Sequence, residues 1–413
     1  MLEALAMVMA GGKGERLYPL TRDRTKPAVP FGGKYRLIDF VLSNLINSHI
    51  HSIYVLTQFK SQSLTEHILE NWRLGTMLTN HFIIPVPAQM RMGETWYRGT
   101  ADAIYQNAHL IRNHKPEIVA VFGADHIYKM NIRDMIHYHR EKGADVTIAA
   151  IPCPQSESRS YGVIQVDESW QVEGFQEKPE EPATIPGKPD MILASMGNYL
   201  FNRDVLLEVL ESDAVIKGSH DFGKDILPAT YQDLRVYAYD FRRNKLPGLA
   251  PDEVNDYWRD VGTIDSYWEA NMDLRSVIPT FNLYNKYWPI YTSRIPAPPA
   301  KFVHDKDGHP GHAINSIISE GCIISGSTII DSILGPFVHL HGYSEVHQSI
   351  FMEDVEVGQG SRIRKAIIDK HVVIPPETQI GFNLEEDRKK YYVSPKGVVV
   401  IPKGSKYDRP PYV

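Results

Sequence analysis

The stretch Ala10-Gly11-Gly12-Lys13-Gly14-Glu15-Arg16-Leu17 decides how the first half of this chain is interpreted. It follows the apolar run 5–9, so the chain opens with a predicted buried strand that ends in a glycine-rich loop. Closely spaced glycines allow main-chain N–H groups to face an anion without obstruction by Cβ atoms. Lys13, Arg16 and Lys26 add positive charge, and the loop therefore predicts a polyphosphate site.

The spacing of these glycines excludes two common phosphate-binding loops. A dinucleotide fingerprint needs a glycine where Leu17 stands, and a P-loop needs Gly-Lys followed at once by Ser or Thr. The pattern Gly-Gly-x-Gly-x-Arg-Leu, followed by Lys26-Pro27-Ala28, instead resembles the signature of sugar-phosphate nucleotidylyltransferases. A tight strand-to-loop turn without a ligand is the structural alternative for the loop taken alone.

Length, charge and cysteine content limit the function classes. The 413 residues predict about two to three domains. The formal net charge of −6, with both signs intermixed, provides no basic stripe and argues against nucleic-acid and membrane partners. Cys153 and Cys322 lie far apart, so no disulfide framework is expected. The apolar start is too short to span a bilayer, carries Glu3 and lacks a signal-peptide pattern, so a cytoplasmic location is expected.

Apolar, strand-like runs alternate with helix-like segments up to about residue 280. Examples are the strand-like runs 53–56 and 118–122 and the helix-like segments 36–47 and 101–112. Such alternation predicts an α/β, Rossmann-like catalytic domain over residues 1–280, with a mostly parallel sheet flanked by helices. Ligands bind beyond the carboxyl ends of the strands in such sheets. The glycine loop and the segment after residue 122 are therefore expected on one rim.

The sequence pattern changes after a proline-rich segment, which makes 281–310 the predicted linker and 311–413 a second domain. Apolar residues there recur every six positions, at Ile317, Ile323 and Ile329, at Phe351, Val357 and Ile363, and at Ile368, Ile374 and Ile380. A hexapeptide repeat with small or polar corners predicts a parallel β-helix whose coils direct these positions inward. A sandwich of short strands is the alternative, but hairpin turn signals are not regularly placed.

Two aspartates are candidate ligands for Mg²⁺. Asp125 follows the predicted strand 118–122, where a carboxylate is exposed at the rim of the sheet. Magnesium bound to nucleotide phosphates takes one or two protein carboxylates, so a second aspartate is expected, and Asp260 is the candidate. Either aspartate alone also fits a capping or turn position.

The segment Glu177-Lys178-Pro179 is the candidate sugar-phosphate site. Proline biases the preceding Lys178 toward extended backbone, which lets its side chain project from a strand end. A fixed ammonium there binds a phosphate, and Glu177 is placed to accept hydrogen bonds from sugar hydroxyls. Segments 96–103 and 194–199 combine rings with small and polar groups and are candidate walls of the same site. A solvated Glu-Lys-Pro turn is the alternative.

Taken together, the motifs resemble the ADP-glucose pyrophosphorylase family of bacterial glycogen and plant starch synthesis, over nearly the whole chain. The specific markers are Thr25-Lys26-Pro27-Ala28-Val29-Pro30-Phe31-Gly32-Gly33-Lys34-Tyr35-Arg36, Trp96-Tyr97-Arg98-Gly99-Thr100-Ala101-Asp102-Ala103, Ser219-His220-Asp221-Phe222-Gly223-Lys224-Asp225 and Tyr257-Trp258-Arg259-Asp260-Val261-Gly262-Thr263.

The resemblance implies that ATP and α-D-glucose 1-phosphate give ADP-glucose and pyrophosphate, with Mg²⁺, in a homotetramer whose C-terminal left-handed β-helix serves regulation and assembly. It places Gly11, Gly12, Gly14, Arg16 and Lys26 at the triphosphate, Gln58 and Trp96 near the adenine and ribose, Tyr97, Gly162, Glu177, Lys178, Ser195, Tyr199 and Asp221 at glucose 1-phosphate, and Asp125 and Asp260 at the metal. Arg16, Asp125 and Lys178 are the implied catalytic residues.

The expected mechanism is an in-line attack on the α-phosphorus of ATP. The sugar phosphate is already an anionic nucleophile, so neither a covalent intermediate nor a general base is needed. Several alternatives stay open: a pyrophosphorylase for another nucleotide or hexose, a non-catalytic regulatory subunit, or acyl transfer by the β-helix. The histidines of the repeat region, His339, His341 and His347, have no evident catalytic setting.

Arg24 and Arg36 are the candidate anion site for a small-molecule effector, because they follow the nucleotide loop closely. By the resemblance, effectors bind where the two domains meet. In the enteric type activated by fructose 1,6-bisphosphate, a lysine, a histidine and an arginine stand where this chain has Asp23, Pro30 and Asn113. An effector other than fructose 1,6-bisphosphate is therefore expected.

Overall fold

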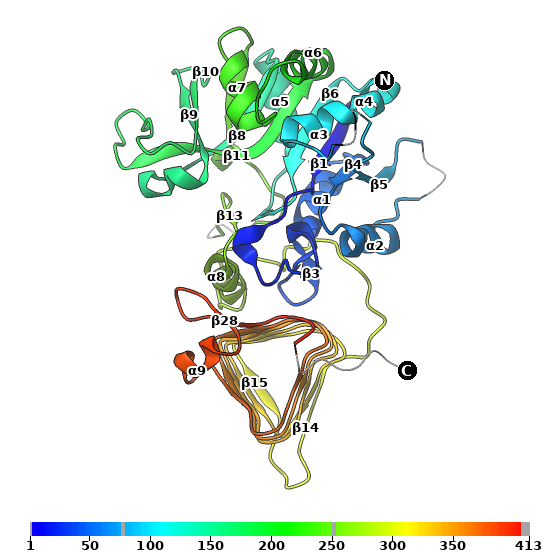
Figure 1. Cartoon of the computed structure of the whole chain (residues 1–413), viewed down its shortest axis with the longest axis vertical. Coiled ribbons are helices and arrows are strands. Elements are labelled where there is room, and N and C mark those ends of the chain that lie inside the picture. The colour runs from blue at the N-terminus through cyan, green and yellow to red at the C-terminus, as the bar shows by residue number, and fades with distance from the viewer. Residues whose placement is uncertain (1, 76–78, 92, 94, 250–252, 406–413) are drawn as a thin grey trace.

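The computed structural model describes residues 2–75, 79–91, 93, 95–249 and 253–405. An α/β domain forms one end of the molecule and a β-helix of triangular cross-section forms the other, with α8 (Ile264–Leu274) between them (Figure 1). The fold class predicted from the alternation and from the hexapeptide repeat is confirmed.

A mixed, mostly parallel sheet forms the centre of the α/β domain. Its neighbours run in the order β10-β9-β11-β6-β1-β4-β5, with β8 beside β11 and β12 beside β8. The pairs β1–β4, β1–β6, β4–β5 and β8–β12 are parallel, whereas β11 runs antiparallel to β6, β8 and β9. The strands are β1 (Ala4–Met9), β4 (Ser52–Thr57), β5 (Phe82–Pro87), β6 (Ile118–Gly123), β8 (Val146–Pro154), β9 (Gly162–Val166), β10 (Val172–Glu177), β11 (Met191–Asn202) and β12 (Val236–Asp240). Two small ribbons pair β2 (Pro30–Phe31) with β3 (Tyr35–Arg36) and β7 (His126–Tyr128) with β13 (Trp258–Asp260).

Helices cover both faces of this sheet because its buried strands are apolar on both sides. In β1, Ala6 and Val8 contribute to one core while Leu5 and Met7 contribute to the other. The first core includes side chains of α1 (Leu37–Asn47), α2 (Gln62–Asn71) and α5 (Ile132–Glu141), and the second includes those of α3 (Thr100–Gln106), α4 (Ala108–His114), α6 (Arg203–Ala214) and α7 (Leu227–Thr230). The predicted helix 101–112 is two helices that meet at Asn107, whose side-chain amide donates to the carbonyl of Ala103.

The β-helix consists of strands that stack into the sides of a triangular prism, all parallel to their neighbours except β28, which pairs antiparallel with β29 (Figure 1). Each side of the prism is named by the sheet that forms it. Sheet E contains β14 (Lys301–Val303), β17 (Ile323–Ser325), β20 (His339–Leu340), β23 (Glu356–Val357) and β26 (Val373–Ile374). Sheet F contains β15 (His312–Ile314), β18 (Thr328–Ile330), β21 (Glu345–His347), β24 (Arg362–Arg364) and β27 (Gln379–Ile380). Sheet G contains β16 (Ile317–Ile318), β19 (Ile333–Leu334), β22 (Ile350–Phe351), β25 (Ala366–Ile368), β29 (Val399–Ile401) and β28 (Tyr392–Val393), and α9 (Leu384–Arg388) precedes β28.

The predicted inward positions of the repeat are correct for most of the coils. The residues that lie in the β-helix core as expected are Ile329, Phe351, Val357, Ile363, Ile368, Ile374 and Ile380. Ile317 and Ile323 were expected there too, but each begins an Ile-Ile doublet whose second member turns inward. The periodicity alone does not show which isoleucine of a doublet faces the core. The first strand, β14, also lies inside the segment 281–310 predicted as linker.

Sheet G packs against the α/β domain. Ile333, Ile350, Ile367 and Val400 project outward from it into a third core, which also contains Leu17 and Tyr267. Trp268 of α8 donates its indole N–H to the carbonyl of Gln348 at 2.9 Å. The two domains therefore share an apolar interface as well as polar contacts.

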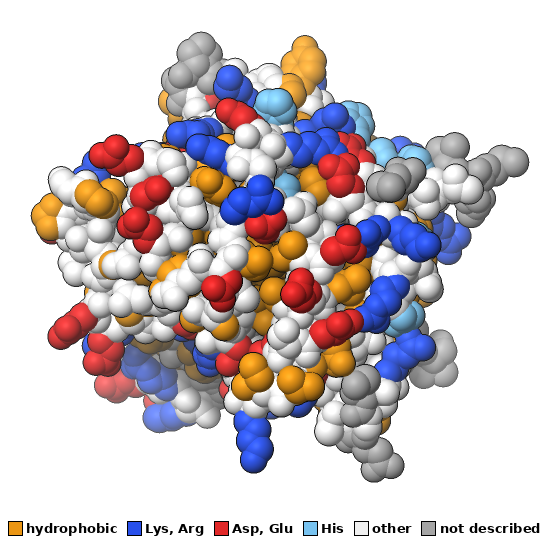
Figure 2. All heavy atoms as spheres, turned by 90° about the horizontal axis from the view of Figure 1, so that it is seen from above, with side chains coloured by type: hydrophobic (Ala, Val, Ile, Leu, Met, Phe, Trp, Pro, Cys, Tyr) orange, Lys and Arg blue, Asp and Glu red, His pale blue; other side chains and the backbone are white. Residues whose placement is uncertain are grey.

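Cys153 and Cys322 are free thiols, as the sequence predicted. Burial raises the pKa of Cys153 to about 12 and that of Cys322 to about 11, so neither is a ready nucleophile. Among the described residues, no helix combines the length and apolarity needed to cross a bilayer. On the face shown in Figure 2, acidic and basic side chains are intermixed.

Candidate active site

A cavity of about 800 Å³ opens at the carboxyl ends of β1 and β6. The glycine loop lines one part of it, and Glu177 and Lys178 line another. The structure thus brings together residues that are far apart in the sequence, on the rim where ligands of α/β sheets bind. From the predicted set, its lining includes Gly11, Gly12, Gly14, Arg16, Lys26, Gln58, Tyr97, Asp125, Gly162, Glu177, Lys178, Ser195, Tyr199, Asp221 and Asp260.

The glycine loop is held in place from behind. The hydroxyl of Thr25 donates to the carbonyl oxygens of Ala10 (3.3 Å) and Gly12 (3.2 Å), and that of Thr21 donates to the carbonyl of Gly14 (3.0 Å). Gly14 has a φ of +65°, and a Cβ there would lie 2.8 Å from the Cβ of Lys26. The glycine therefore permits both the left-handed backbone and the close approach of Lys26.

Lys26 joins the two predicted metal ligands. Its Nζ lies 2.9 Å from Oδ2 of Asp125 and 2.7 Å from Oδ1 of Asp260, and its side chain is 7% exposed. The two carboxylates thus surround one ammonium group. The sequence predicted both aspartates but assigned Lys26 to the triphosphate alone.

Strand pairing brings Asp260 to Asp125. Asp125 immediately precedes β7, and β13 pairs antiparallel with β7 so that Asp260 lies opposite His126. Arg16 reaches the same place, with Nη2 at 3.3 Å from Oδ2 of Asp260. Since Arg16 is 65% exposed, its guanidinium stays accessible to a ligand in the cavity.

These contacts fix the charges of the cluster. Burial raises the pKa of Asp125, but the charges of Lys26 and His126 outweigh it and hold that pKa well below its usual range. Burial lowers the pKa of Lys26, but Asp125 and Asp260 outweigh it and raise that pKa above its ordinary value. Asp125 is therefore a carboxylate, and Lys26 an ammonium, throughout the neutral range.

Glu177 and Lys178 lie at the end of β10. Lys178 Nζ lies 3.0 Å from Oε1 of Glu177, and the lysine is half-exposed. Its φ of +51° is left-handed rather than the extended backbone expected before a proline. Gly162 pairs with Glu177, and a Cβ on Gly162 would lie 3.0 Å from Oε2 of that carboxylate. The absence of a side chain at Gly162 leaves room for Glu177 in the cavity.

A bulge in β11 shapes the wall formed by Ser195 and Tyr199. The pairing of β11 with β8 shifts register between these two residues, around Gly197, whose φ is +70°. Burial raises the pKa of Tyr199, so its hydroxyl stays protonated and can donate.

Asp221 already serves the fold. Its Oδ1 accepts from the main-chain N–H of Gly223 (2.9 Å), which caps the π-helical turn Phe222–Ile226, and its Oδ2 accepts from the hydroxyl of Thr100 (2.9 Å). Asp221 therefore has a structural role, although it also lines the cavity.

The predicted nucleotide-base residues divide into two groups. Gln58 lines the cavity, and its Oε1 accepts from the main-chain N–H of Tyr97 at 2.7 Å. Trp96 does not belong to the cavity lining and is 54% exposed. Its neighbour Tyr97, by contrast, lines the cavity.

Aromatic residues that the sequence did not indicate form part of the wall. The ring of Trp258 lies 4.9 Å from the rings of both His126 and Tyr161, and all three residues line the cavity. Trp258 stands two residues before Asp260 in β13, so alternation along that short strand is the signal that would have found it.

Arg24 and Arg36 lie near the domain junction rather than in the cavity. Nη2 of Arg24 donates to both carboxylate oxygens of Asp369, at 2.8 Å to Oδ1 and 2.9 Å to Oδ2, and the pair is buried. Arg36 donates to the carbonyl and hydroxyl of Ser63 at 2.6 and 3.0 Å. Burial lowers the pKa of Arg36, and the charge of Asp39 opposes that shift. The two arginines thus lie close enough to interact, but Arg24 already has a carboxylate partner.

Comparison with known proteins follows the same division of the chain. Residues 5–277 match the family described as nucleotidyl transferase, and residues 298–401 match the GlmU-like, C-terminal hexapeptide family. The chain is 57% identical to the glucose-1-phosphate adenylyltransferase of Thermus thermophilus, over 98% of this chain and 99% of that protein. The chain belongs to the glucose-1-phosphate adenylyltransferase family.

Further members of the glucose-1-phosphate adenylyltransferase family match as completely. The enzyme of that name from Deinococcus radiodurans is 54% identical over 97% of this chain and 98% of its own length. That from Anaeromyxobacter sp. is 50% identical over 99% of this chain and all of its own length. The chain is accordingly a nucleotidyltransferase, as its sequence motifs indicated.

Proposed function

We propose that this chain transfers the adenylyl group of ATP to α-D-glucose 1-phosphate, releasing pyrophosphate and forming ADP-glucose for glycogen synthesis. One observation carries the proposal: a single cavity joins an anion-binding glycine loop, a paired-aspartate cation site and a second cationic group, Lys178. This is the arrangement that a reaction between two phosphorylated substrates requires.

The triphosphate is assigned to the glycine loop. Gly12 has open space where a Cβ would stand, so the main chain there is accessible to phosphate oxygens. Arg16 and Lys26 supply the positive charge, and Gln58 lies near the adenine. Trp96 is not assigned to the base, since it lies outside the cavity lining.

Glucose 1-phosphate is assigned to the opposite wall. Lys178 binds its phosphate, and Glu177 accepts hydrogen bonds from sugar hydroxyls. Tyr97, Gly162, Ser195, Tyr199 and Asp221 complete this wall. Its glycine and its bulge provide the space that a pyranose ring needs.

The donor set fits a magnesium ion. Asp125 and Asp260 present carboxylate oxygens within 4.8 Å of each other and of a ring nitrogen of His126, and both carboxylates already surround a cation, the ammonium of Lys26. Hard oxygen ligands favour Mg²⁺. When bound, the ion would neutralise charge on the phosphates.

The protein residues promote the reaction by alignment and charge. The sugar phosphate attacks the α-phosphorus of ATP in line, its oxygen forming the new P–O bond while the bond to pyrophosphate breaks. Lys178 orients the nucleophile, while Arg16 and Lys26 stabilise the negative charge that gathers on the leaving pyrophosphate. The nucleophile is anionic, so no residue has to remove a proton.

The test is pyrophosphate release from glucose 1-phosphate and Mg²⁺ with ATP, UTP, GTP or dTTP, for the wild type and Asp125→Ala. ATP-selective release that is lost in the variant supports the proposal. Release with another nucleotide would identify a different pyrophosphorylase. No release with any nucleotide, even with added sugar-phosphate effectors, would indicate a regulatory subunit.

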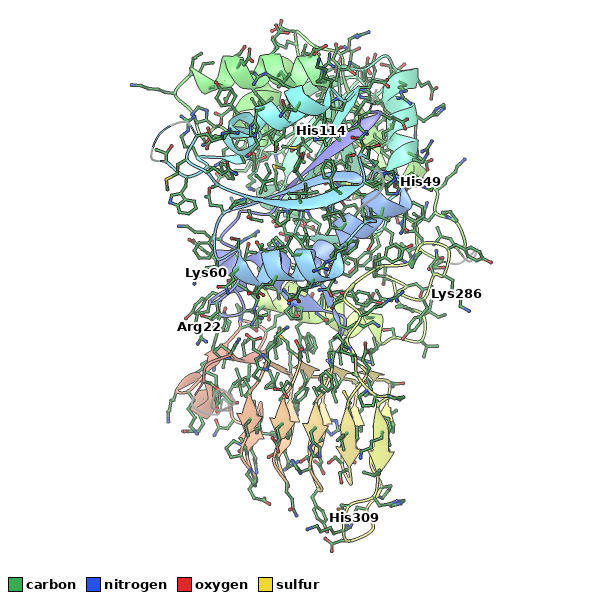
Figure 3. All side chains as sticks on the ribbon, turned by 90° about the vertical axis from the view of Figure 1, so that its right-hand side faces the viewer. Arg22, His49, Lys60, His114, Lys286 and His309 are labelled. Atoms are coloured by element: carbon green, nitrogen blue, oxygen red, sulfur yellow. The ribbon has the colours of Figure 1, made fainter. Side chains whose placement is uncertain are left out.

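We also propose a cytoplasmic homotetramer controlled by a small anionic effector near the domain junction. Arg22 lies on the side of the α/β domain that faces the β-helix (Figure 3), and Lys60 donates to its main-chain carbonyl. Arg36 and the partly buried Lys370 add to the positive charge of the junction, and burial and the charge of Arg36 lower the pKa of Lys370. Arg24, Arg36 and Lys370 support an anion site there, although Asp39, Glu353 and Asp369 offset part of their charge.

A further inference from the structure

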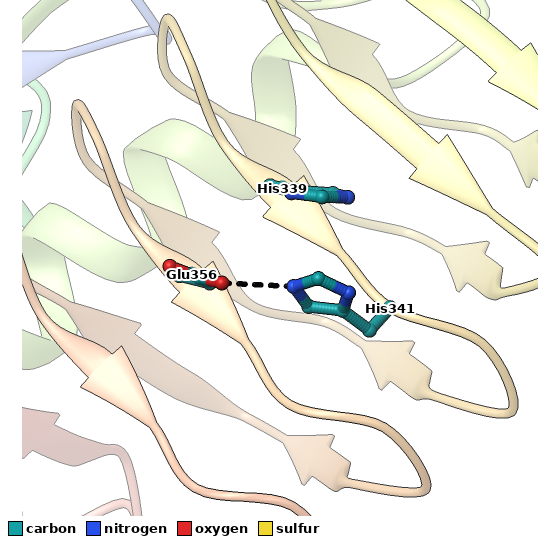
Figure 4. Close-up of side chains that lie close together, drawn as sticks. All are labelled: His339, His341 and Glu356. Atoms are coloured by element: carbon teal, nitrogen blue, oxygen red, sulfur yellow. Dashed lines mark hydrogen bonds and ion pairs between the residues drawn. The ribbon is translucent and has the colours of Figure 1, made fainter.

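The outer face of sheet E carries a cluster of two histidines and one glutamate. His339, His341 and Glu356 each present a ligand atom within 4.8 Å of the other two (Figure 4). Nε2 of His341 lies 2.9 Å from Oε1 of Glu356, and the rings of His339 and His341 have their centroids 4.0 Å apart. The cluster lies in the β-helix, away from the active-site cavity.

Strand geometry explains why the three side chains converge. Leu340, between the two histidines, is fully buried in the β-helix core, so strand alternation places both histidines on the outside. On the next coil His339 pairs in register with Glu356, which precedes the fully buried Val357. The main-chain N–H of His341 donates to the carbonyl of Val357 at 3.0 Å, which fixes its backbone.

We propose that His339, His341 and Glu356 form a zinc site on the β-helix. Two imidazoles and one carboxylate are ligands that suit Zn²⁺, whereas Mg²⁺ and Ca²⁺ prefer oxygen alone. Bonds of about 2.0–2.1 Å in a tetrahedral site place ligand atoms roughly 3.4 Å apart. Side-chain rotations bring the three atoms to that spacing, since the strands already hold them on one side. Water takes the fourth position.

The site is distinct from the other acidic and histidine-containing clusters of the described chain. Asp125, His126 and Asp260 belong to the active site. Asp305, Asp307 and His309 lie in a loop where Asp305 already accepts from the main-chain N–H groups of the other two. His309 lies on the side of the β-helix that points away from the α/β domain (Figure 3). Sheet G faces the α/β domain, so sheet E remains outside that contact.

The experiment is a calorimetric titration with Zn²⁺. The protein is first stripped of metal ions, and excess Mg²⁺ is then added to occupy the active-site carboxylates. His339→Ala, His341→Ala and Glu356→Gln are compared with the controls His347→Ala, from β21 of sheet F, and His309→Ala. We expect the first three variants to bind Zn²⁺ at least about tenfold more weakly. Removing a residue that only hydrogen-bonds to a metal ligand already costs about 10–100-fold in metal affinity. The controls keep wild-type affinity.

The coordination is read separately from Co²⁺ absorption in the visible range. The wild type should show the bands of a tetrahedral nitrogen and oxygen site, and His341→Ala should lose them while its circular dichroism and adenylyltransferase rate stay unchanged. Wild-type Zn²⁺ affinity in both histidine variants would overturn the proposal. So would a Zn²⁺ signal that disappears in His309→Ala, or no Zn²⁺ binding by the wild type.

Discussion

Arg24 of the α/β domain contacts both carboxylate oxygens of Asp369 of the β-helix through its Nη2, and both side chains are almost completely buried. Asp369 follows β25, the strand of sheet G whose Ile367 packs into the shared third core. A charged pair thus lies beside an apolar contact at the domain junction. Since neither charge can be hydrated there, each depends on the other.

Removing one member of this pair should loosen the junction. Asp369→Ala leaves the Arg24 guanidinium buried without its carboxylate, and we expect a loss of about 3–5 kcal/mol in the free energy of unfolding. Urea titration followed by tryptophan fluorescence measures it. Arg362→Ala, which removes an exposed pair with Glu345 on sheet F, is the control and should change little. Equal midpoints for the two variants would show that the buried pair does not hold the domains together.

Substitution of Gly14 should reduce activity through Lys26. An alanine there would adopt a left-handed backbone at a cost of about 1–2 kcal/mol and place its Cβ against Lys26. We expect kcat/KM for ATP to fall at least roughly tenfold, since 1.4 kcal/mol corresponds to a factor of ten. Gly187→Ala is the matched control: its φ is +74° but nothing lies within 4 Å of the added Cβ. A comparable loss in both variants would refute a local effect on Lys26.

Lys178 should control the affinity for the sugar phosphate but not for ATP. A hydrogen bond to a charged group contributes about 1.5–3 kcal/mol, so Lys178→Ala should raise KM for glucose 1-phosphate by roughly ten- to a hundredfold. The KM for ATP should change little. Initial rates of pyrophosphate release at varied substrate concentrations measure both. Lys188→Ala, an exposed lysine in a nearby turn, controls for the loss of charge. An increase in KM for ATP alone would reverse the assignment of the two walls.

The acid limb of the pH–rate profile should come from the substrate. The pKa of Asp125 is lower in the folded protein than its unfolded value of about 3.9. The stabilisation from its charge is therefore complete at any pH above that unfolded pKa, and it is lost only as pH falls through the folded pKa. The pKa of Lys26 is higher in the folded protein than its unfolded value of about 10.4. The stabilisation from its charge is therefore complete at any pH below that unfolded pKa, and it is lost as pH rises through the folded pKa. Neither group therefore titrates near neutrality.

The dianion of a phosphate monoester takes up one proton near pH 6, so kcat/KM for glucose 1-phosphate should fall below about pH 6. Rates measured from pH 5 to pH 9 at constant ionic strength test this. Asp125→Asn should lower the whole curve by at least about a hundredfold without moving its acid midpoint. A shifted midpoint would mean that Asp125 itself titrates in this range.

Arg36 should contribute to effector binding. Arg36→Ala removes positive charge from the junction, so the activation constant of an anionic effector should rise at least roughly tenfold, the loss of one charged hydrogen bond. Activation curves with a panel of phosphorylated sugars and carboxylates measure it. Arg73→Ala is the control, because Arg73 is exposed and donates to the main-chain carbonyl of Leu69. Unchanged activation constants in Arg36→Ala would remove Arg36 from the effector site.

The sequence predicts the structure best where residues that are adjacent in the chain determine it. The glycine loop follows β1 directly, so its place on the rim follows from the alternation of strands and helices. The sequence predicts the site less well where strands that are distant in the chain pair with each other. Alternation along β13 places Trp258 and Asp260 on one face of that strand, but only the pairing of β13 with β7 brings this face to the cavity. Trp96 and Tyr97 are adjacent aromatic residues, and the hydrogen bond that the Asn107 amide donates to the Tyr97 hydroxyl is a contact that the sequence does not show.

The hexapeptide strands also record which side of the prism is covered by protein. In sheet G, apolar residues occur as adjacent pairs: Ile317-Ile318, Ile333-Leu334, Ile350-Phe351, Ile367-Ile368 and Val400-Ile401. One member of such a pair fills the β-helix and its neighbour faces the α/β domain, as with Leu334 and Ile333. Sheet F instead flanks its inward residue with charge, as in Arg362-Ile363-Arg364. A doublet that recurs in coil after coil, as in sheet G, therefore marks the side that packs against the α/β domain, whereas the single doublet Ile323-Ile324 of sheet E does not.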